Sequence, residues 1–137
     1  MFVLALALVA PSPAGANTQS HIRCIDLGGR VGPLSHSEMV TMATVCERAA
    51  HEHERAARGL SGAGRQEQEL NEAAALYFAA LGQIGTGHIR QGVNSLARST
   101  SLMINVRDHG ATSDLRDRAR SGVQAVDSTI NALGNMK

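Results

Sequence analysis

The chain has 137 residues, of which 43% are hydrophobic and 2% aromatic, and its 13 Lys and Arg residues nearly balance its 12 Asp and Glu residues. A length of this order predicts one domain with one core. Nucleic-acid binders concentrate positive charge on one face, so the even charge balance predicts no nucleic-acid partner. Beyond Phe2, the aromatic residues are Tyr77 and Phe78, which are too few for the stacking surfaces of sugar, base or haem sites.

An apolar run opens the chain. Phe2 to Ala10 are nine consecutive apolar residues, and Ala14-Gly15-Ala16 follows as a small-residue cleavage site. This pattern predicts a secretory signal peptide over residues 1–16, cleaved before Asn17, although no Lys or Arg precedes the apolar run. An ordinary apolar N-terminus is the alternative. Because a membrane-spanning helix needs about 20 apolar residues, we expect no integral membrane span and a periplasmic or secreted protein.

Cys24 and Cys46 are the two cysteines of the chain. In an exported protein an even count predicts a disulfide bond, here between Cys24 and Cys46. Closing a loop of about 20 residues stabilises a fold by about 3 kcal/mol in the chain-entropy model. Two free thiols or a metal-binding pair are the alternatives. The disulfide would pin residues 17–34 to the first helix. We expect this segment to be irregular because it contains Gly28, Gly29, Gly32 and Pro33.

The remaining sequence, residues 35–137, is rich in helix-forming residues and predicts a single all-α domain. Ser35 and Glu38 form a capping-box pattern that starts a first helix running to about Arg58. Three more helices are predicted over about 66–84, 88–107 and 112–133, separated by glycine-containing breaks. A closed bundle would hide the apolar stripes of all four helices, whereas stacked hairpins would leave a concave face for a ligand. The stripes of the last two helices consist of Ile89, Val93, Leu96, Thr100, Met103 and Ile104, and of Leu115, Ala119, Gly122, Val126, Ile130 and Leu133.

Short links between amphipathic helices favour antiparallel neighbours. The expected fold is therefore an antiparallel bundle or two stacked helical hairpins, made of about four helices. The run from Ala75 to Ser99 resembles a single tetratricopeptide hairpin, but no second copy follows at the 34-residue offset of that repeat. The sequence therefore assigns the chain to no family.

The most conspicuous polar cluster is His51-Glu52-His53-Glu54. Adjacent residues on a helix point about 100° apart, so His51 and His53 diverge and cannot chelate one ion together. The His-Glu-x-x-His spacing of zinc proteases is absent, as are a nucleophile elbow and a phosphate loop. We expect no enzyme activity, no metal and no cofactor. His53 lies on the apolar stripe, where we expect a hydrogen-bonded, partly buried imidazole.

These observations favour a small exported helical protein-interaction or structural module without catalytic activity, whose partner is another protein or a second copy. The alternative is a periplasmic small-ligand or metal-binding helical bundle, with Glu47, His51 and His53 as its ligands. The predicted interaction surface comprises Leu76, Phe78 and Leu102, which fall outside the principal stripes. The opposing expectation is that these three residues pack under segment 17–34 or seal a homodimer.

A minor hypothesis is that the protein responds to acid through its histidines. The chain has six histidines, and histidine side chains gain charge as the pH falls through about 6. The sequence shows no interface that this charging would break.

Overall fold

The structure is a computed structural model that describes residues 18–30 and 32–135; the predicted signal peptide over residues 1–16 lies outside this part of the chain. The described residues form five helices, which confirms the all-α prediction: α2 (Gln19–Gly28), α3 (His36–Arg58), α4 (Gly62–Gly85), α5 (Ile89–His109) and α6 (Ser113–Gly134). None of these five helices combines the length and the apolar character that crossing a membrane requires.

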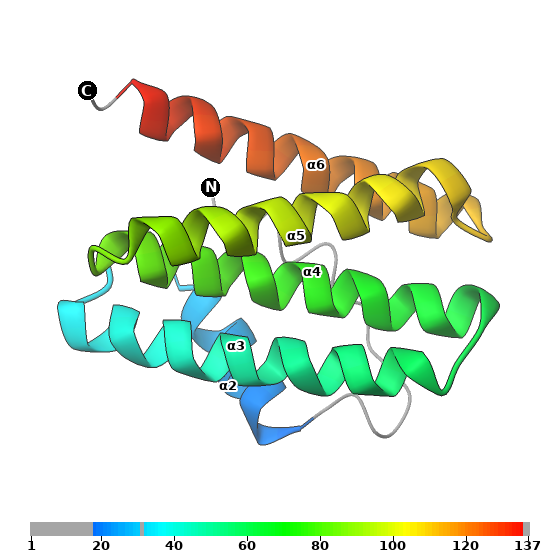
Figure 1. Cartoon of the computed structure of the whole chain (residues 1–137), viewed down its shortest axis with the longest axis horizontal. Coiled ribbons are helices and arrows are strands. Elements are labelled where there is room, and N and C mark those ends of the chain that lie inside the picture. The colour runs from blue at the N-terminus through cyan, green and yellow to red at the C-terminus, as the bar shows by residue number, and fades with distance from the viewer. Residues whose placement is uncertain (1–17, 31, 136–137) are drawn as a thin grey trace.

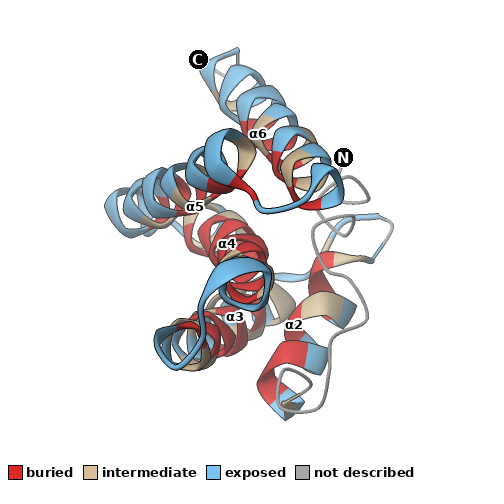
Figure 2. Ribbon diagram, turned by 90° about the vertical axis from the view of Figure 1, so that its right-hand side faces the viewer, coloured by how far each residue is buried: buried red, intermediate tan, exposed pale blue. Residues whose placement is uncertain are grey.

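Helix α4 is the centre of the fold. It packs along α3 and α5 and also contacts α2 and α6 (Figure 1), and every residue from Leu70 to Ala80 is buried. Helices α3 and α6 lie on opposite sides of α4 (Figure 2). The two hairpins α3–α4 and α5–α6 therefore form an open stack rather than a closed ring, which decides between the two architectures that the sequence left open.

Small residues let the helices of this stack approach closely. A methyl group at Gly82 would lie 2.6 Å from the carbonyl oxygen of Met39, and one at Gly92 would lie 2.5 Å from Cγ1 of Ile84. Real Cβ atoms essentially never come within 3.0 Å of a non-bonded heavy atom, so a side chain at either position would force a neighbour to shift. The α3–α4 and α4–α5 crossings are thus set by positions that have no side chain.

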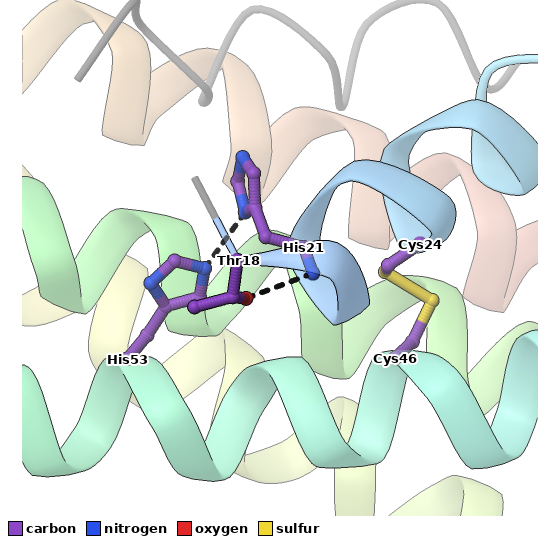
Figure 3. Close-up of a disulfide and its surroundings, with 5 residues drawn as sticks. All are labelled: Thr18, His21, Cys24, Cys46 and His53. Carbon is purple, nitrogen blue, oxygen red and sulfur yellow. Dashed lines mark hydrogen bonds between the residues drawn. A yellow bond between two sulfur atoms is a disulfide. The ribbon is translucent and has the colours of Figure 1, made fainter. Parts of the chain in front are cut away.

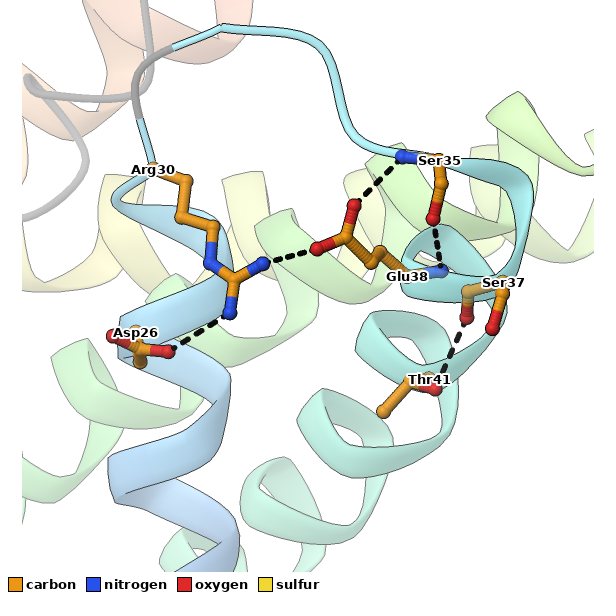
Figure 4. A network of polar contacts seen from close by, with 6 residues as sticks. All are labelled: Asp26, Arg30, Ser35, Ser37, Glu38 and Thr41. Carbon is orange, nitrogen blue, oxygen red and sulfur yellow. Dashed lines mark hydrogen bonds and ion pairs between the residues drawn. The ribbon is translucent and has the colours of Figure 1, made fainter.

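The predicted capping box starts α3. The Ser35 hydroxyl oxygen accepts a hydrogen bond from the Glu38 backbone N–H at 3.1 Å, and the Glu38 carboxylate accepts one from the Ser35 backbone N–H at 2.9 Å (Figure 4). Arg30 pairs with the same carboxylate and also lies 3.5 Å from the Asp26 carboxylate. This network ties the end of α2 to the start of α3.

The prediction that residues 17–34 are irregular was wrong for Gln19–Gly28, which form α2. The Thr18 hydroxyl oxygen accepts a hydrogen bond from the backbone N–H of His21 at 3.2 Å and caps the helix. Cys24 and Leu27 on one face of α2 are buried. The glycines that argued against a helix lie at its end and in the connection to α3, so they terminate α2 instead of preventing it.

The predicted Cys24–Cys46 disulfide is present and joins α2 to α3 (Figure 3). The two Cα atoms are 4.8 Å apart, and both cysteines are fully buried. Helix α2 is therefore held covalently against the open side of the α3–α4 hairpin.

Candidate functional site

An apolar groove with a volume of about 650 Å³ lies between α5 and α6. Its lining contains no charged and no aromatic side chain. Nine residues form it: Val93, Leu96, Ala97, Thr100, Ser101 and Ile104 from α5, and Ile130, Leu133 and Gly134 from α6.

The groove exists because the hairpin α5–α6 is fixed to α4 by one face of each helix. The residues of α5 that turn inward recur at helical spacing and include the small residues Gly92 and Ser99 beside Leu96, Met103 and Val106. The Ser99 hydroxyl donates a hydrogen bond to the carbonyl oxygen of Ala73 at 2.7 Å. Val93 and Ile104 lie on the flank of α5 that lines the groove, where they stay partly exposed.

Helix α6 is attached to α4 by polar contacts along its length. The Arg118 guanidinium contacts both carboxylate oxygens of Glu67, at 2.8 and 3.0 Å, and the Tyr77 and Thr129 hydroxyls are 2.6 Å apart in a buried pair. Beyond Thr129, the α6 side chains Ile130 and Leu133 line the groove. The last two turns of α6 thus form a wall of the groove.

Exposed aliphatic side chains concentrate here. Val93 is 53% exposed, Ile130 is 49% exposed and Ile104 is 36% exposed. A closed bundle would have hidden these three residues, whereas the stacked hairpins leave them exposed. The signal that could have identified the inward face of α5 is the spacing of Gly92 and Ser99, since small residues seven apart mark a close helix crossing.

The structure places the predicted interaction residues elsewhere. Phe78 is fully buried and Leu76 is 9% exposed, and Leu102 is only partly exposed against the core. Gly28 of α2 lies directly on the Phe78 ring, since a methyl group at Gly28 would come within 2.5 Å of it. The proposed exposed surface was therefore wrong, and for Phe78 the opposing expectation of packing under segment 17–34 is confirmed. The sequence analysis expected Phe78 to be exposed because it did not predict α2, the helix that covers this side chain.

The candidate metal ligands do not converge. His51 is exposed and His53 is buried on another face of α3. Glu47 lines a separate cavity of about 150 Å³ between α3, α4 and the start of α5, together with Gln83 and His88. In residues 18–30 and 32–135, no group of three or more His, Cys, Asp or Glu side chains is positioned to hold a metal ion.

A buried polar chain connects α2, α3 and α4, and Figure 3 shows its two histidines beside the disulfide. His21 Nδ1 lies 2.8 Å from His53 Nε2, and His53 Nδ1 lies 2.9 Å from Gln68 Oε1. Burial lowers the pKa of both imidazoles, and the charge of Glu52 opposes this shift at both. The expectation of a buried, hydrogen-bonded His53 is confirmed, whereas the His21 partner was not predicted because it lies on the missed helix.

Comparison of the chain with protein-family models, curated proteins and solved structures finds no match. The function is therefore argued from the geometry of this chain.

Proposed function

We propose that this protein is an exported, non-catalytic interaction module and that its α5–α6 groove receives the apolar face of an amphipathic helix of another protein. The observation that carries the proposal is the uncharged groove, whose aliphatic side chains Val93 and Ile130 are about half exposed. Contiguous exposed apolar surface on a small protein is typical of interaction sites and ligand-binding grooves.

The dimensions of the groove support a helical partner. Its α5 wall runs from Val93 to Ile104, which is about 16 Å at the rise of an α-helix. That length matches about three turns of a docked helix, the usual footprint of helix-in-groove recognition. The absence of charged groups in the lining means that the docked face must itself be apolar, because a charge there would lose its hydration without gaining a partner.

The experiment uses a fluorescent synthetic peptide of leucine and lysine with helical amphipathic spacing, and a scrambled peptide of the same composition. We expect the amphipathic peptide to bind and the scrambled one to bind at least tenfold more weakly in fluorescence anisotropy. Ile130→Asp should weaken binding by at least tenfold, because it places a charge in the apolar contact.

Ile22→Asp is the matched control, since Ile22 is an isoleucine on another helix that is 51% exposed, against 49% for Ile130. This variant should bind the peptide as the unmodified protein does. The proposal would be contradicted if the amphipathic and scrambled peptides bound equally well. It would also be contradicted if Ile130→Asp and Ile22→Asp weakened peptide binding to the same extent.

The alternative function, a small-ligand carrier, is favoured by one observation: a cavity of about 650 Å³ falls within the range of small-molecule sites. The probe is palmitate, whose chain matches the aliphatic lining. Stoichiometric binding of palmitate that blocks the peptide would assign the groove to lipid instead of protein. Stoichiometric metal in protein purified without an affinity tag would support the metal-binding alternative.

Export rests on the predicted signal peptide and is supported by the disulfide, because such bonds persist in oxidising compartments. When the full chain is expressed in a Gram-negative host, we expect the protein in the periplasmic or extracellular fraction with Asn17 as its N-terminal residue. N-terminal sequencing tests this. Recovery of the uncleaved chain in the cytoplasm would contradict it.

A further inference from the structure

Two of the side-chain attachments that hold helix α2 on the α3–α4 hairpin differ in their chemistry. One is the covalent Cys24–Cys46 bond in the second half of the helix. The other is the contact of His21 with His53 near its start, where the ring centroids are 4.8 Å apart and the planes cross at 86° (Figure 3). Only the second of these attachments depends on protonation.

The hydrogen bonds define which nitrogens carry protons. The Gln68 side-chain oxygen can only accept, so the His53 Nδ1 that faces it at 2.9 Å is the donor. The Nε2 of a neutral His53 is then an acceptor, and the His21 Nδ1 at 2.8 Å donates to it. The pair therefore holds one hydrogen between two ring nitrogens.

A single added proton is compatible with this pairing, because a proton on Nε2 of His21 leaves the hydrogen bond from its Nδ1 to His53 Nε2 in place. A second proton leaves two N–H groups facing each other across 2.8 Å, and the pair then carries two positive charges in a buried position. Such burial is costly unless opposite charges compensate.

The surrounding groups compensate in part. Glu52 on α3 is the charged group that acts on both imidazoles, and its carboxylate also accepts a hydrogen bond from the Thr18 hydroxyl at 2.8 Å. From α4 the group in contact is the neutral Gln68. A single carboxylate faces two imidazoles that could each become positively charged. The effect of burial is larger than the attraction of this carboxylate, so the pKa of each imidazole stays below its ordinary value.

We propose that the first turns of α2, residues 18–23, form an acid-released segment: protonation of His21 and His53 detaches it from α3 while the disulfide keeps the rest of the helix in place. The buried face of α3 around His53 then becomes accessible. The detached histidines regain the ordinary pKa of about 6.5. Attachment is therefore strongest above that pH and weakens as the pH falls below it, by up to about tenfold per pH unit for each histidine.

The test is hydrogen exchange of the disulfide-bonded protein at pH 7.5 and pH 5, corrected for the intrinsic pH dependence of exchange. Between the two, we expect the protection factors of the amides of residues 22–24 to fall at least tenfold. Protection in the centre of α4, around Ala74, should not change. His53→Gln keeps a hydrogen-bonding side chain that cannot be protonated and should greatly reduce the response.

His51→Gln is the matched control, because His51 is an exposed histidine on the same helix; this variant should respond as the unmodified protein does. His21→Gln provides a second test that does not depend on how well His53→Gln folds. Unchanged protection in the unmodified protein would overturn the proposal, as would a full response in His21→Gln and His53→Gln. Equal loss of protection in α2 and α4 would also overturn it, since this would show acid unfolding of the whole chain.

Discussion

Gly82 lies where α3 and α4 cross, and the nearest atoms to an added methyl group are backbone atoms of Met39 and Ala43, at 2.6 and 2.9 Å. Backbone cannot move aside as a flexible side chain can. We expect Gly82→Ala to lower the free energy of unfolding by about 1–3 kcal/mol through overpacking. Urea denaturation followed by circular dichroism measures this change.

Gly64 provides the control within the same helix. A methyl group there would meet nothing within 4 Å, so Gly64→Ala should be neutral or stabilise by up to about 1 kcal/mol through helix propensity. Equal destabilisation by the two substitutions would show that the close approach of α3 and α4 is not what Gly82 provides.

Single residues were predictable from sequence where their contacts are local. The Ser35–Glu38 capping box spans three residues, and both of its hydrogen bonds are present. Phe78 was not predictable in this way, because its burial depends on Gly28, which is 50 positions earlier in the chain and had been assigned to an irregular segment. The contact between His21 and His53, which are 32 positions apart, was not predicted for the same reason.

At the scale of elements, α2 depends on its covalent anchor. It is a ten-residue helix, and isolated helices of that length are marginal in water. We expect the double substitution Cys24→Ser and Cys46→Ser to lower the free energy of unfolding by about 3 kcal/mol, the loop-closure contribution of this disulfide.

Chemical denaturation with and without reductant checks this prediction. Dithiothreitol should lower the stability of the unmodified protein by the same amount and leave the double variant unchanged. If full reduction, verified by thiol titration, left the unmodified protein as stable as before, the disulfide would contribute nothing to the fold.

Helix positions were predictable because apolar periodicity and glycine breaks are properties of each segment alone, and α3, α5 and α6 begin and end close to the predicted residues. Helix faces were harder. On α5 one apolar stripe is only partly covered, since Val93 and Ile104 are exposed whereas Leu96 and Met103 are buried. Periodicity shows that a face is apolar, and the position of neighbouring helices decides whether it is covered.

At the scale of the whole molecule, the open stack explains why an apolar groove can exist on so small a protein. A closed four-helix bundle would bury the apolar stripes of all four helices together. Here α6 lies across α4 from α3 (Figure 2), so the inner faces of α5 and α6 are not sealed by a further helix. The architecture was narrowed from sequence to two alternatives, and the choice between them required long-range contacts that no local pattern encodes.

The packing order of the helices has a consequence for how this chain acquires its structure. The main helix pairs are neighbours in sequence, α2 with α3, α3 with α4, α4 with α5 and α5 with α6. Chains dominated by such local contacts fold quickly, because little loop-closure entropy is lost before contacts form. The disulfide also joins helices that are neighbours in sequence, because it links α2 to α3. Oxidation of Cys24 and Cys46 therefore requires only the first third of the chain, and the covalently joined α2–α3 pair can provide the surface on which α4 then assembles.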